Sequence, residues 1–233
     1  MPSLGQINSD LCAPNIIDIY GEVGKEWILQ LPSLLSACAD KWQLDILQPF
    51  DDLSYNYVTP AIRADKTPVV LKAGVPSDEF SREIQSLLVF EGSGMVKILD
   101  CDREEGIMLL ERLLPGKSLA SIDNDELLTR AAVSVMQQLW TPAPLNHEFG
   151  SVNDWASGLS NIKRLFHGSY GPFPSDLVNL AQELFNEFQN PLEDNILIHG
   201  DFHPMNIRSS NRAPCLAIDP KGVVGDPLYD VAT

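Results

Sequence analysis

The sequence predicts an α+β fold in two parts, an antiparallel sheet with one internal helix followed by a mainly helical half. Between residues 44 and 111, short apolar runs alternate with polar turns, which is typical of antiparallel strands. Residues 123–188 contain longer segments whose apolar residues recur every three or four positions, as in helices. A Pro-Gly break at residues 113–116 separates the two patterns, so we expect one part at residues 1–112 and another at 113–233.

The first part combines two helices with the sheet. Residues 1–20 are rich in small polar residues and indicate a loose lead-in, whereas residues 22–42 show a helical period that Pro32 could kink. Ser77 is suited to cap a second helix, because two acidic residues follow it, and this helix is expected to end near Gly92. Five strands are expected, at residues 44–49, 55–63, 67–73, 95–100 and 107–111.

The second part is predicted to hold three helices and two short strands. The helical period runs through residues 123–140, 152–166 and 175–188, with prolines between these segments. Two short apolar runs, at residues 196–198 and 216–218, flank a polar loop. We expect these runs to pair with each other as strands and to fix the loop between them.

The composition limits the classes of partner. The chain has 16 basic and 32 acidic residues, a net charge of −16, and no basic cluster, which argues against nucleic acid. The same charge favours a cationic small molecule, although acidity can also serve solubility alone. No apolar run is long enough to span a membrane. Four cysteines without metal-binding spacing, and no signal-peptide pattern, favour the cytoplasm; the oligomeric state stays open.

The stretch from His199 to Asn206, H-G-D-F-H-P-M-N, carries the most specific chemical signal. Together with Asp219, which ends a later apolar run, it has the order of acidic and amide residues found in kinases. Asp201 would accept the proton of an attacking hydroxyl, while Asn206 and Asp219 would hold Mg²⁺ against the phosphates of ATP. Each residue alone is also compatible with a turn or a helix cap, and only the combination favours phosphoryl transfer.

A lysine and a glutamate complete the expected nucleotide site. Lys72 ends an apolar strand eleven residues before Glu83 of the expected helix, an arrangement that clamps the α- and β-phosphates of ATP. Glu79 lies one helical turn earlier and competes with Glu83 for this role. The turn that covers the phosphates in protein kinases is rich in glycine, but the corresponding turn here has none, so Ser54 and Asn56 are the candidate donors.

Further residues are expected to support this site. Segment 109–113, which includes Glu111, would join the two parts and offer its backbone groups to adenine. Asp226 would hold the catalytic loop in place, with a helix cap as the alternative. His199 would hydrogen-bond to the backbone. A zinc site that combines it with His203 is disfavoured, because the glycine and proline beside them prevent a continuous helix.

Four segments resemble the aminoglycoside phosphotransferase family: L-I-H-G-D-F-H-P-M-N-I, A-I-D-P-K-G-V-V-G-D-P-L-Y-D, V-V-L-K and E-F-S-R-E-I. The D-P-K-G-V-V-G segment is most similar to the branch of streptomycin and hydroxyurea kinases. The resemblance implies a protein-kinase-like fold and transfer of the γ-phosphate of ATP, with Mg²⁺, to a hydroxyl of an aminoglycoside such as streptomycin. By position it makes Asp201 the base, Asn206 and Asp219 the metal ligands, and Lys72 with Glu83 the phosphate clamp.

One departure from the family concerns the C-terminus. Family members continue past G-D-P-x-x-D with helices that line the substrate cleft, whereas this chain stops three residues after Asp230. We therefore expect a C-terminally short helical part, in a fragment or a truncated relative, with an exposed apolar surface. Three alternatives stay open: a kinase for hydroxyurea, an amino alcohol or a sugar; an inactive nucleotide-binding remnant; and a metal-dependent hydrolase using the Asp and His cluster.

Overall fold

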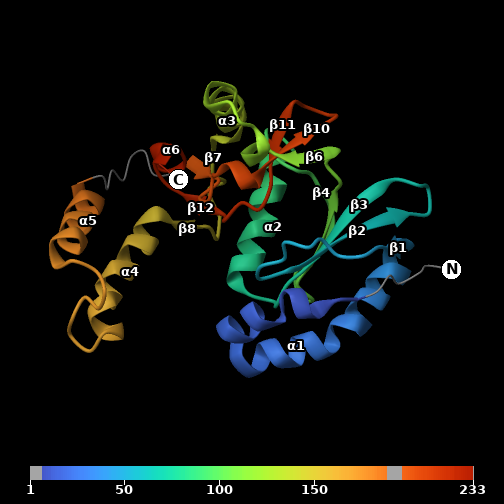
Figure 1. The fold of residues 1–233 in the computed structure, drawn as a ribbon, viewed down its shortest axis with the longest axis horizontal. Coiled ribbons are helices and arrows are strands. Elements are labelled where there is room, and N and C mark those ends of the chain that lie inside the picture. Colours follow the sequence, from blue (N-terminus) through green and yellow to red (C-terminus); the bar gives the residue numbers. More distant parts are fainter. Residues whose placement is uncertain (1–6, 188–195, 233) are drawn as a thin grey trace.

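A five-stranded antiparallel sheet fills the first half of the chain in the computed structural model, which describes residues 7–187 and 196–232 (Figure 1). The strands lie in the order β1-β2-β3-β5-β4, and every neighbouring pair is antiparallel. All five predicted strands are confirmed, although several of their ends differ. They are β1 (Leu44–Ile46), β2 (Tyr57–Arg63), β3 (Pro68–Ala73), β4 (Ile98–Asp102) and β5 (Ile107–Glu111).

Strand β4 begins later than predicted, because the residues before it contact the second half of the chain. Met95 and Val96, predicted to start the strand, lie beside Ala217 instead. Met95 forms a parallel bridge with Ala217, and the Val96 amide donates to the Ala217 carbonyl at 2.8 Å. The Ala217 amide in turn donates to the Gly94 carbonyl at 2.8 Å. The segment before β4 therefore connects the five-stranded sheet to strand β11 (Cys215–Ala217).

Each face of the five-stranded sheet covers a separate hydrophobic core. Successive residues of a strand point to opposite faces. Leu71 and Leu109 belong to the core that the sheet shares with helix α1 (Ala13–Trp42). Met108 and Leu110 belong to the core that it shares with helix α2 (Asp78–Phe90) and the second half. Burial on both faces explains why β3 and β5 read in the sequence as continuous apolar runs.

Helix α1 (Ala13–Trp42) begins earlier than predicted, so the expected loose lead-in is wrong from residue 13 onward. Gly21 interrupts the helix with φ 57° and ψ −128°, and the predicted helix is the segment after this break. Pro32 lies within the helix and does not divide it, since the break in helical backbone angles is at Gly21. Gly24 lets the two segments approach, because a Cβ there would lie 2.7 Å from the Ile16 carbonyl oxygen.

Helix α2 (Asp78–Phe90) starts at the predicted cap. The Ser77 hydroxyl accepts a hydrogen bond from the Phe80 amide at 3.2 Å, which satisfies one of the free amides of the first turn. The buried face of the helix carries Phe80 and Ile84 toward the core, and Glu83 lies on the same buried side. A glutamate in that position needs a charged partner, which the candidate site supplies.

The helices predicted for the second half are confirmed to within two residues at each described end. Helices α4 and α5 pack on each other and project from the side of the molecule (Figure 1). The predicted helix end at residue 188 lies outside the described residues. The helices are α3 (Asp125–Leu139), α4 (Val152–Leu165), α5 (Ser175–Glu187) and a short α6 (Leu228–Ala232).

Two small sheets make the second half less purely helical than predicted. The expected pairing of residues 196–198 with 216–218 is wrong, because β9 pairs with β7 and β12, whereas β11 pairs with β10. The sequence shows no strand signal at β10 or β12, and these two strands occupy the positions next to β11 and β9. One sheet has the order β11-β10-β6 and the other β7-β9-β12-β8. Their remaining bounds are β6 (Pro115–Ser118), β7 (Thr141–Pro142), β8 (Gly150–Ser151), β9 (Ile196–Ile198), β10 (Ile207–Ser210) and β12 (Val223–Val224).

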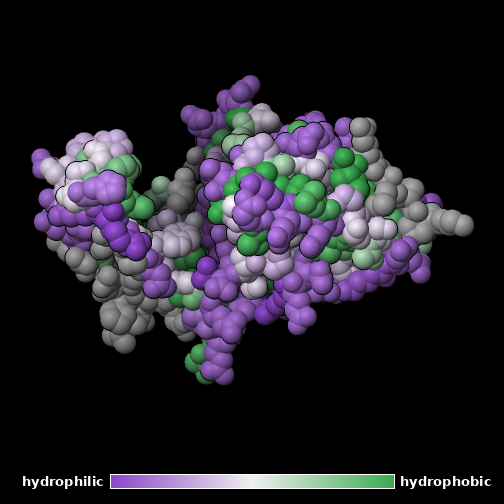
Figure 2. Space-filling model, turned by 90° about the horizontal axis from the view of Figure 1, so that it is seen from below, coloured by the Kyte–Doolittle hydropathy of each residue, from purple (hydrophilic) through white to green (hydrophobic). Residues whose placement is uncertain are grey.

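The surface is mostly hydrophilic, with local groups of apolar side chains. Figure 2, viewed from the side of α1 in Figure 1, shows apolar residues gathered near the centre of that face. Helix α1 exposes Ile19, Val23 and Leu29, and helix α5 exposes Leu177 and Leu180. Within the described part of the chain, no helix combines the length and the apolar character needed to cross a membrane. All four cysteines are free.

Candidate functional site

The candidate site is built on the β10–β11 hairpin. Asn206 precedes β10 and Asp219 follows β11, and the antiparallel register pairs Ile207 with Ala217. The Ile218 amide donates to the Asn206 carbonyl at 2.9 Å, so the two predicted metal ligands lie at the same end of the hairpin. Asp219 has φ 59°, a left-handed conformation that redirects the chain immediately after the hairpin.

Lys72 joins three elements at the centre of the site. Its ammonium lies 2.6 Å from Glu83 Oε1 and 3.1 Å from Asp219 Oδ1. Strand β3 supplies the lysine, α2 the glutamate, and the turn after β11 the aspartate. The Lys72 side chain is only 4% exposed, so carboxylates and not water surround its charge. The predicted Lys72–Glu83 pair is therefore brought together, whereas the competing Glu79 contacts Lys221 at 3.0 Å.

Burial and charge act in opposite directions on these three groups. Burial disfavours the Lys72 ammonium, but the charges of Asp219 and Glu83 outweigh it and raise the pKa of Lys72 above its ordinary value. The Asp219 side chain is 47% exposed, so desolvation opposes its charged form only in part, and the Lys72 charge lowers the pKa of that carboxyl. For Glu83 burial prevails and raises the pKa in spite of Lys72. Asp219 is thus the firmly ionised partner of the ammonium.

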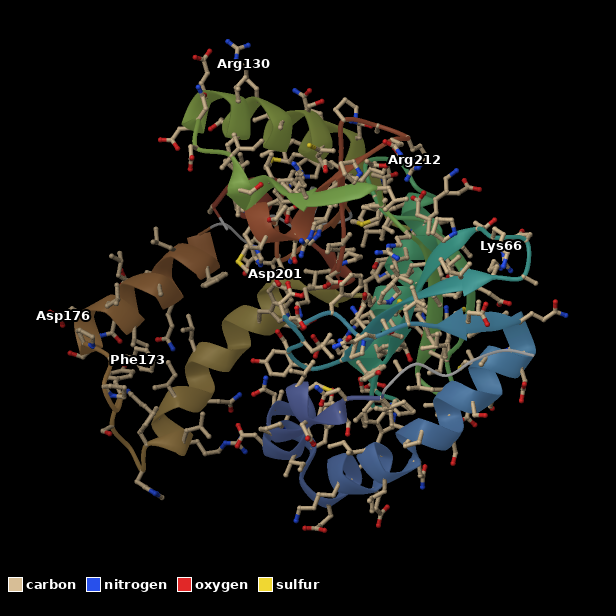
Figure 3. All side chains as sticks on the ribbon, turned by 45° about the vertical axis from the view of Figure 1, so that its right-hand side comes forward. Lys66, Arg130, Phe173, Asp176, Asp201 and Arg212 are labelled. Atoms are coloured by element: carbon tan, nitrogen blue, oxygen red, sulfur yellow. The ribbon has the colours of Figure 1, made fainter. Side chains whose placement is uncertain are left out.

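Asp201 lies in the loop between β9 and β10, with its side chain 41% exposed. The Asn206 amide nitrogen donates to the Asp201 main-chain oxygen at 3.0 Å and lies 3.5 Å from its carboxylate. The same nitrogen lies 3.2 Å from His203 Nε2, which is 3.6 Å from Asp201 Oδ1. Figure 3 shows Asp201 near the end of α4 that adjoins the rest of the molecule. With its nitrogen engaged here, the Asn206 amide directs its oxygen away from these partners.

Asp230, in α6, holds the main chain of the loop that carries Asp201. Its carboxylate accepts hydrogen bonds from the amides of His199 at 2.9 Å and Gly200 at 2.8 Å, and from the Trp140 indole at 3.3 Å. The prediction that Asp226 holds this loop is wrong, because Asp226 accepts from an amide two residues further on, at 2.8 Å, and caps α6 locally. The sequence offers no way to separate these two aspartates, since both flank the same Pro-containing turn.

His199 is fully buried and links the loop to the turn after β11. Its Nδ1 accepts from the Asp201 amide at 3.2 Å, so Nε2 carries the proton and donates to the Ile218 carbonyl at 2.8 Å. Burial lowers the pKa of His199 and outweighs the opposing charge of Asp230, which keeps the ring neutral at pH 7. The predicted backbone role of His199 is confirmed, and both ring nitrogens have partners within the protein.

Glu111 ends β5, where the chain passes into the second half. Its carboxylate lies 2.6 Å and 3.3 Å from Arg212 nitrogens and accepts from the Lys97 amide at 2.8 Å. Arg212 also donates to the carbonyls of Gly92 and Met95, each at 2.8 Å. The Glu111 side chain is therefore engaged within the protein, which leaves the main chain for the predicted adenine contact. No sequence signal points to Arg212, because its partners are far away along the chain.

Ser54 and Asn56 lie in the turn before β2, where the phosphate donors are predicted. The Ser54 carbonyl accepts from the Asn15 side chain at 3.0 Å. The Asn56 side-chain oxygen packs so close to Gly74 that no Cβ fits between them. Asp52 of the same turn lies 3.8 Å from Arg208 in β10. These contacts bring the turn to the catalytic hairpin, but they do not direct either predicted donor toward Lys72.

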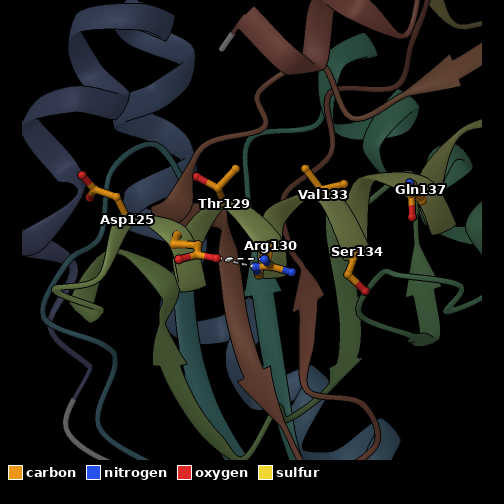
Figure 4. Close-up of a pocket in the computed structure, with 7 residues that line it drawn as sticks. Asp125, Thr129, Arg130, Val133, Ser134 and Gln137 are labelled. Atoms are coloured by element: carbon orange, nitrogen blue, oxygen red, sulfur yellow. Dashed lines mark hydrogen bonds and ion pairs between the residues drawn. The ribbon is translucent and has the colours of Figure 1, made fainter.

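Two surface hollows lie away from this site. Figure 4 shows the first, along the outer face of α3, where Glu126 and Arg130 form an ion pair at 2.8 Å. The second lies between α1 and the turn that precedes β5. Neither is lined by Lys72, Asp201 or Asp219, so the hollows carry no part of the predicted chemistry.

Comparisons with known proteins find relatives that cover most of the chain. A family model described as aminoglycoside/hydroxyurea antibiotic resistance kinase matches residues 44–233. A streptomycin 6-kinase from Streptomyces griseus is 31% identical over 223 residues, which cover 91% of this chain and 68% of that kinase. A hydroxyurea phosphotransferase from Kitasatospora aureofaciens is 30% identical, with 91% of this chain and 62% of that protein covered. The choline kinase LicA from Streptococcus pneumoniae has a similar fold, with a TM-score of 0.62, 17% identity, and coverage of 87% and 73% of the two chains.

Proposed function

Because the chain belongs to the aminoglycoside/hydroxyurea antibiotic resistance kinase family, and is thus a phosphotransferase with a hydroxyl acceptor, we propose that it transfers the γ-phosphate of ATP to an aminoglycoside such as streptomycin. The observation that carries the proposal is the Lys72–Glu83–Asp219 contact beside the Asp201 loop. It joins a buried ammonium to an ionised carboxylate at the place where the kinase pattern predicts the phosphates.

In the proposed reaction, Lys72 binds the α- and β-phosphates while Glu83 keeps its ammonium in position. The acceptor hydroxyl lies against Asp201, which takes the hydroxyl proton as the oxygen attacks the γ-phosphorus. The bond from this phosphorus to the bridging oxygen breaks, and ADP leaves. Asp230 and His199 act on the main chain around Asp201, so they fix the position of the base and make no contact with the acceptor.

Asn206 and Asp219 are suited to hold Mg²⁺. Both offer hard oxygen ligands at one end of the hairpin, and the lowered pKa of Asp219 keeps its carboxylate ionised. The Asn206 amide nitrogen faces the loop, which leaves its oxygen for the metal side. A bound Mg²⁺ would neutralise charge on the nucleotide phosphates.

We also propose the division of the chain into a nucleotide-binding lobe, residues 1–112, and a catalytic lobe, residues 113–233. Adenine would contact the main chain around Glu111 at their junction, and Ser54 and Asn56 would cover the phosphates. The Glu111–Arg212 contact supports a fixed junction, because it joins the end of β5 to the loop of the β10–β11 hairpin.

The proposed acceptor is a cationic small molecule in the cytoplasm. The net charge of −16 favours the approach of a polyamine-like antibiotic and disfavours nucleic acid. Hydroxyurea is the second candidate acceptor, favoured by the similarity to a hydroxyurea phosphotransferase. It is small and uncharged, so the charge argument favours the aminoglycoside.

The test is ADP release with Mg·ATP and each acceptor in turn, streptomycin or hydroxyurea. We expect streptomycin-dependent turnover that falls about 10²- to 10⁴-fold in Asp201→Ala, as for loss of a general base. Asp176→Asn, on α5, is the matched control and should retain turnover. Turnover with hydroxyurea alone would reassign the acceptor. Nucleotide binding without turnover on any acceptor would support an inactive remnant, and full activity of Asp201→Ala would overturn the assigned base.

A further inference from the structure

Lys221 is a second lysine at the candidate site, and nothing in the kinase pattern above assigns it a role. It follows Asp219 and Pro220 in the turn after β11. Its amide donates to the His199 carbonyl at 2.8 Å. A Cβ added to Gly200 would lie 3.2 Å from the Lys221 Cβ. The Lys221 side chain therefore starts against the loop that carries Asp201.

Acidic groups of α2 and of the loop that carries Asp201 act on the charge of the Lys221 ammonium. Glu79 of α2 contacts it directly, with 3.0 Å between Nζ and Oε1. Burial alone would lower the pKa of Lys221, but Glu79 and, less strongly, Asp201 and Glu83 raise it. The side chain is 36% exposed, so the charge is held close to the site and can still be reached from solvent.

The two lysines of the site differ in how they are held. Lys72 is buried between two carboxylates and has little freedom to move. Within the described residues, Lys221 forms an ion pair with one carboxylate, that of Glu79, whose side chain is 59% exposed. Exposed ion pairs are weak, because water screens both charges. Exchange of Glu79 for a more highly charged anion therefore costs little.

A terminal phosphate placed next to Asp201 would be repelled by the negative charges of Asp201, Asp219 and Glu83. A positive side chain on that side of the site would offset this repulsion. Lys72, fixed to Glu83 and Asp219, is suited to the inner phosphates, whereas Lys221 lies on the side of the catalytic loop. We propose that the Lys221 ammonium leaves Glu79 and binds the terminal phosphate of ATP. This inference deepens the proposed nucleotide site and rests on it.

The test is equilibrium binding of Mg·ATP and Mg·ADP to the 233-residue protein, without acceptor. Lys221→Gln should weaken ATP binding about tenfold or more, as for a lost charge-assisted hydrogen bond, and leave ADP binding nearly unchanged. Glu79→Gln should leave ATP binding unchanged or tighter, because it frees the ammonium. Lys66→Gln, in the β2–β3 turn, controls for the loss of one positive charge, and melting temperatures confirm that each variant is folded.

The possible outcomes separate this role from a structural one. If Lys221 only fastens α2 to the turn after β11, Lys221→Gln and Glu79→Gln will weaken binding equally, or Lys221→Gln will weaken ATP and ADP alike. Either result overturns the inference and leaves the nucleotide site standing. If the unmodified protein binds neither nucleotide, the proposed function fails first and this inference fails with it. Recovery of the ATP preference in Lys221→Arg would support a contact through charge.

Discussion

Asp230, in α6, connects the main chain of the catalytic loop to the indole of Trp140. It is almost fully buried, and its carboxylate accepts from two main-chain amides and from an indole. Asp230→Asn replaces one acceptor oxygen by a donor, so a buried amide or indole loses its partner. We expect the free energy of unfolding to fall by about 1–3 kcal/mol, measured by urea denaturation, with a lower kcat.

Asp226→Asn is the matched control for this prediction. Asp226 lies four residues earlier in the same turn, is less buried, and makes a local cap that an asparagine reproduces well. Its loss of stability should stay within about 0.5 kcal/mol. Equal effects of the two substitutions would contradict the assignment of the loop to Asp230.

His199 gives folding stability a dependence on pH. Its pKa in the folded protein is lowered from 6.5 by burial, so below this pH the unfolded chain binds a proton that the folded protein does not bind. Stability from this residue is present above pH 6.5 and is lost as the pH falls. We expect the unfolding free energy to drop by up to about 1.4 kcal/mol per pH unit below that point. His199→Gln should flatten this slope in urea denaturation, while His167→Gln, on an exposed turn, should keep it.

At the scale of elements, replacement of a helical glycine by alanine should have opposite effects on stability at two positions. Gly24→Ala in α1 would place a Cβ 2.7 Å from the Ile16 carbonyl, so the two segments of the helix must separate. In α4, nothing lies within 4 Å of a Cβ at Gly158. We therefore expect Gly158→Ala to stabilise the protein by up to about 1 kcal/mol through helix propensity. Thermal melts should show a lower melting temperature for Gly24→Ala, and equal shifts would contradict the packing of the α1 segments.

The same scale explains which elements could be predicted. Strands β2, β3 and β5 are long, apolar runs, and the helices α2 to α5 repeat their apolar residues over several turns, so local sequence defines them. Strands β7, β8 and β12 have two residues each, too few to show a period. Gly21 breaks α1 because its φ is positive. A glycine can adopt this conformation, but its presence in the sequence does not show that it will.

In the candidate site too, contacts between segments close in sequence could be predicted and contacts between distant segments could not. Lys72 and Glu83 could be paired from their spacing, because a strand and the next helix lie close together along the chain. Asp230, Arg212 and Lys221 act across contacts between distant segments, and a single sequence contains no signal for such contacts. The error at Asp226 and Asp230 has this origin, since only the folded loop decides which carboxylate it meets.

At the scale of the whole molecule, three of the contacts between the first half and the second half meet in one region. They are the bridge of Met95 to Ala217, the ion pair of Glu111 with Arg212, and the contact of Lys72 with Asp219. All three reach the β10–β11 hairpin or the turn after it. The β10–β11 hairpin therefore holds the predicted metal ligands and also packs against the first half of the chain. Substitutions in it should affect both the contact between the halves and the candidate site.

Helices α4 and α5 take no part in these three contacts. They pack on each other and project from the side of the molecule (Figure 1). Among the described apolar side chains of the two helices, Val178 alone is buried, whereas Leu177 and Leu180 are at least half exposed. Few buried contacts mean a low free energy for local opening. The helix pair should therefore open independently of the sheet.

Hydrogen exchange followed by mass spectrometry tests this expectation. Amides of residues 152–187 should exchange much faster than those of β3 and β5, which lie between two hydrophobic cores. Leu177→Glu, on the exposed face of α5, should leave the melting temperature of the whole protein nearly unchanged, whereas Leu71→Ala in β3 should lower it by several degrees, because its side chain is fully buried. Equal protection of α5 and β3 would show that the apolar face of α5 is covered in solution, for example by a second copy of the chain.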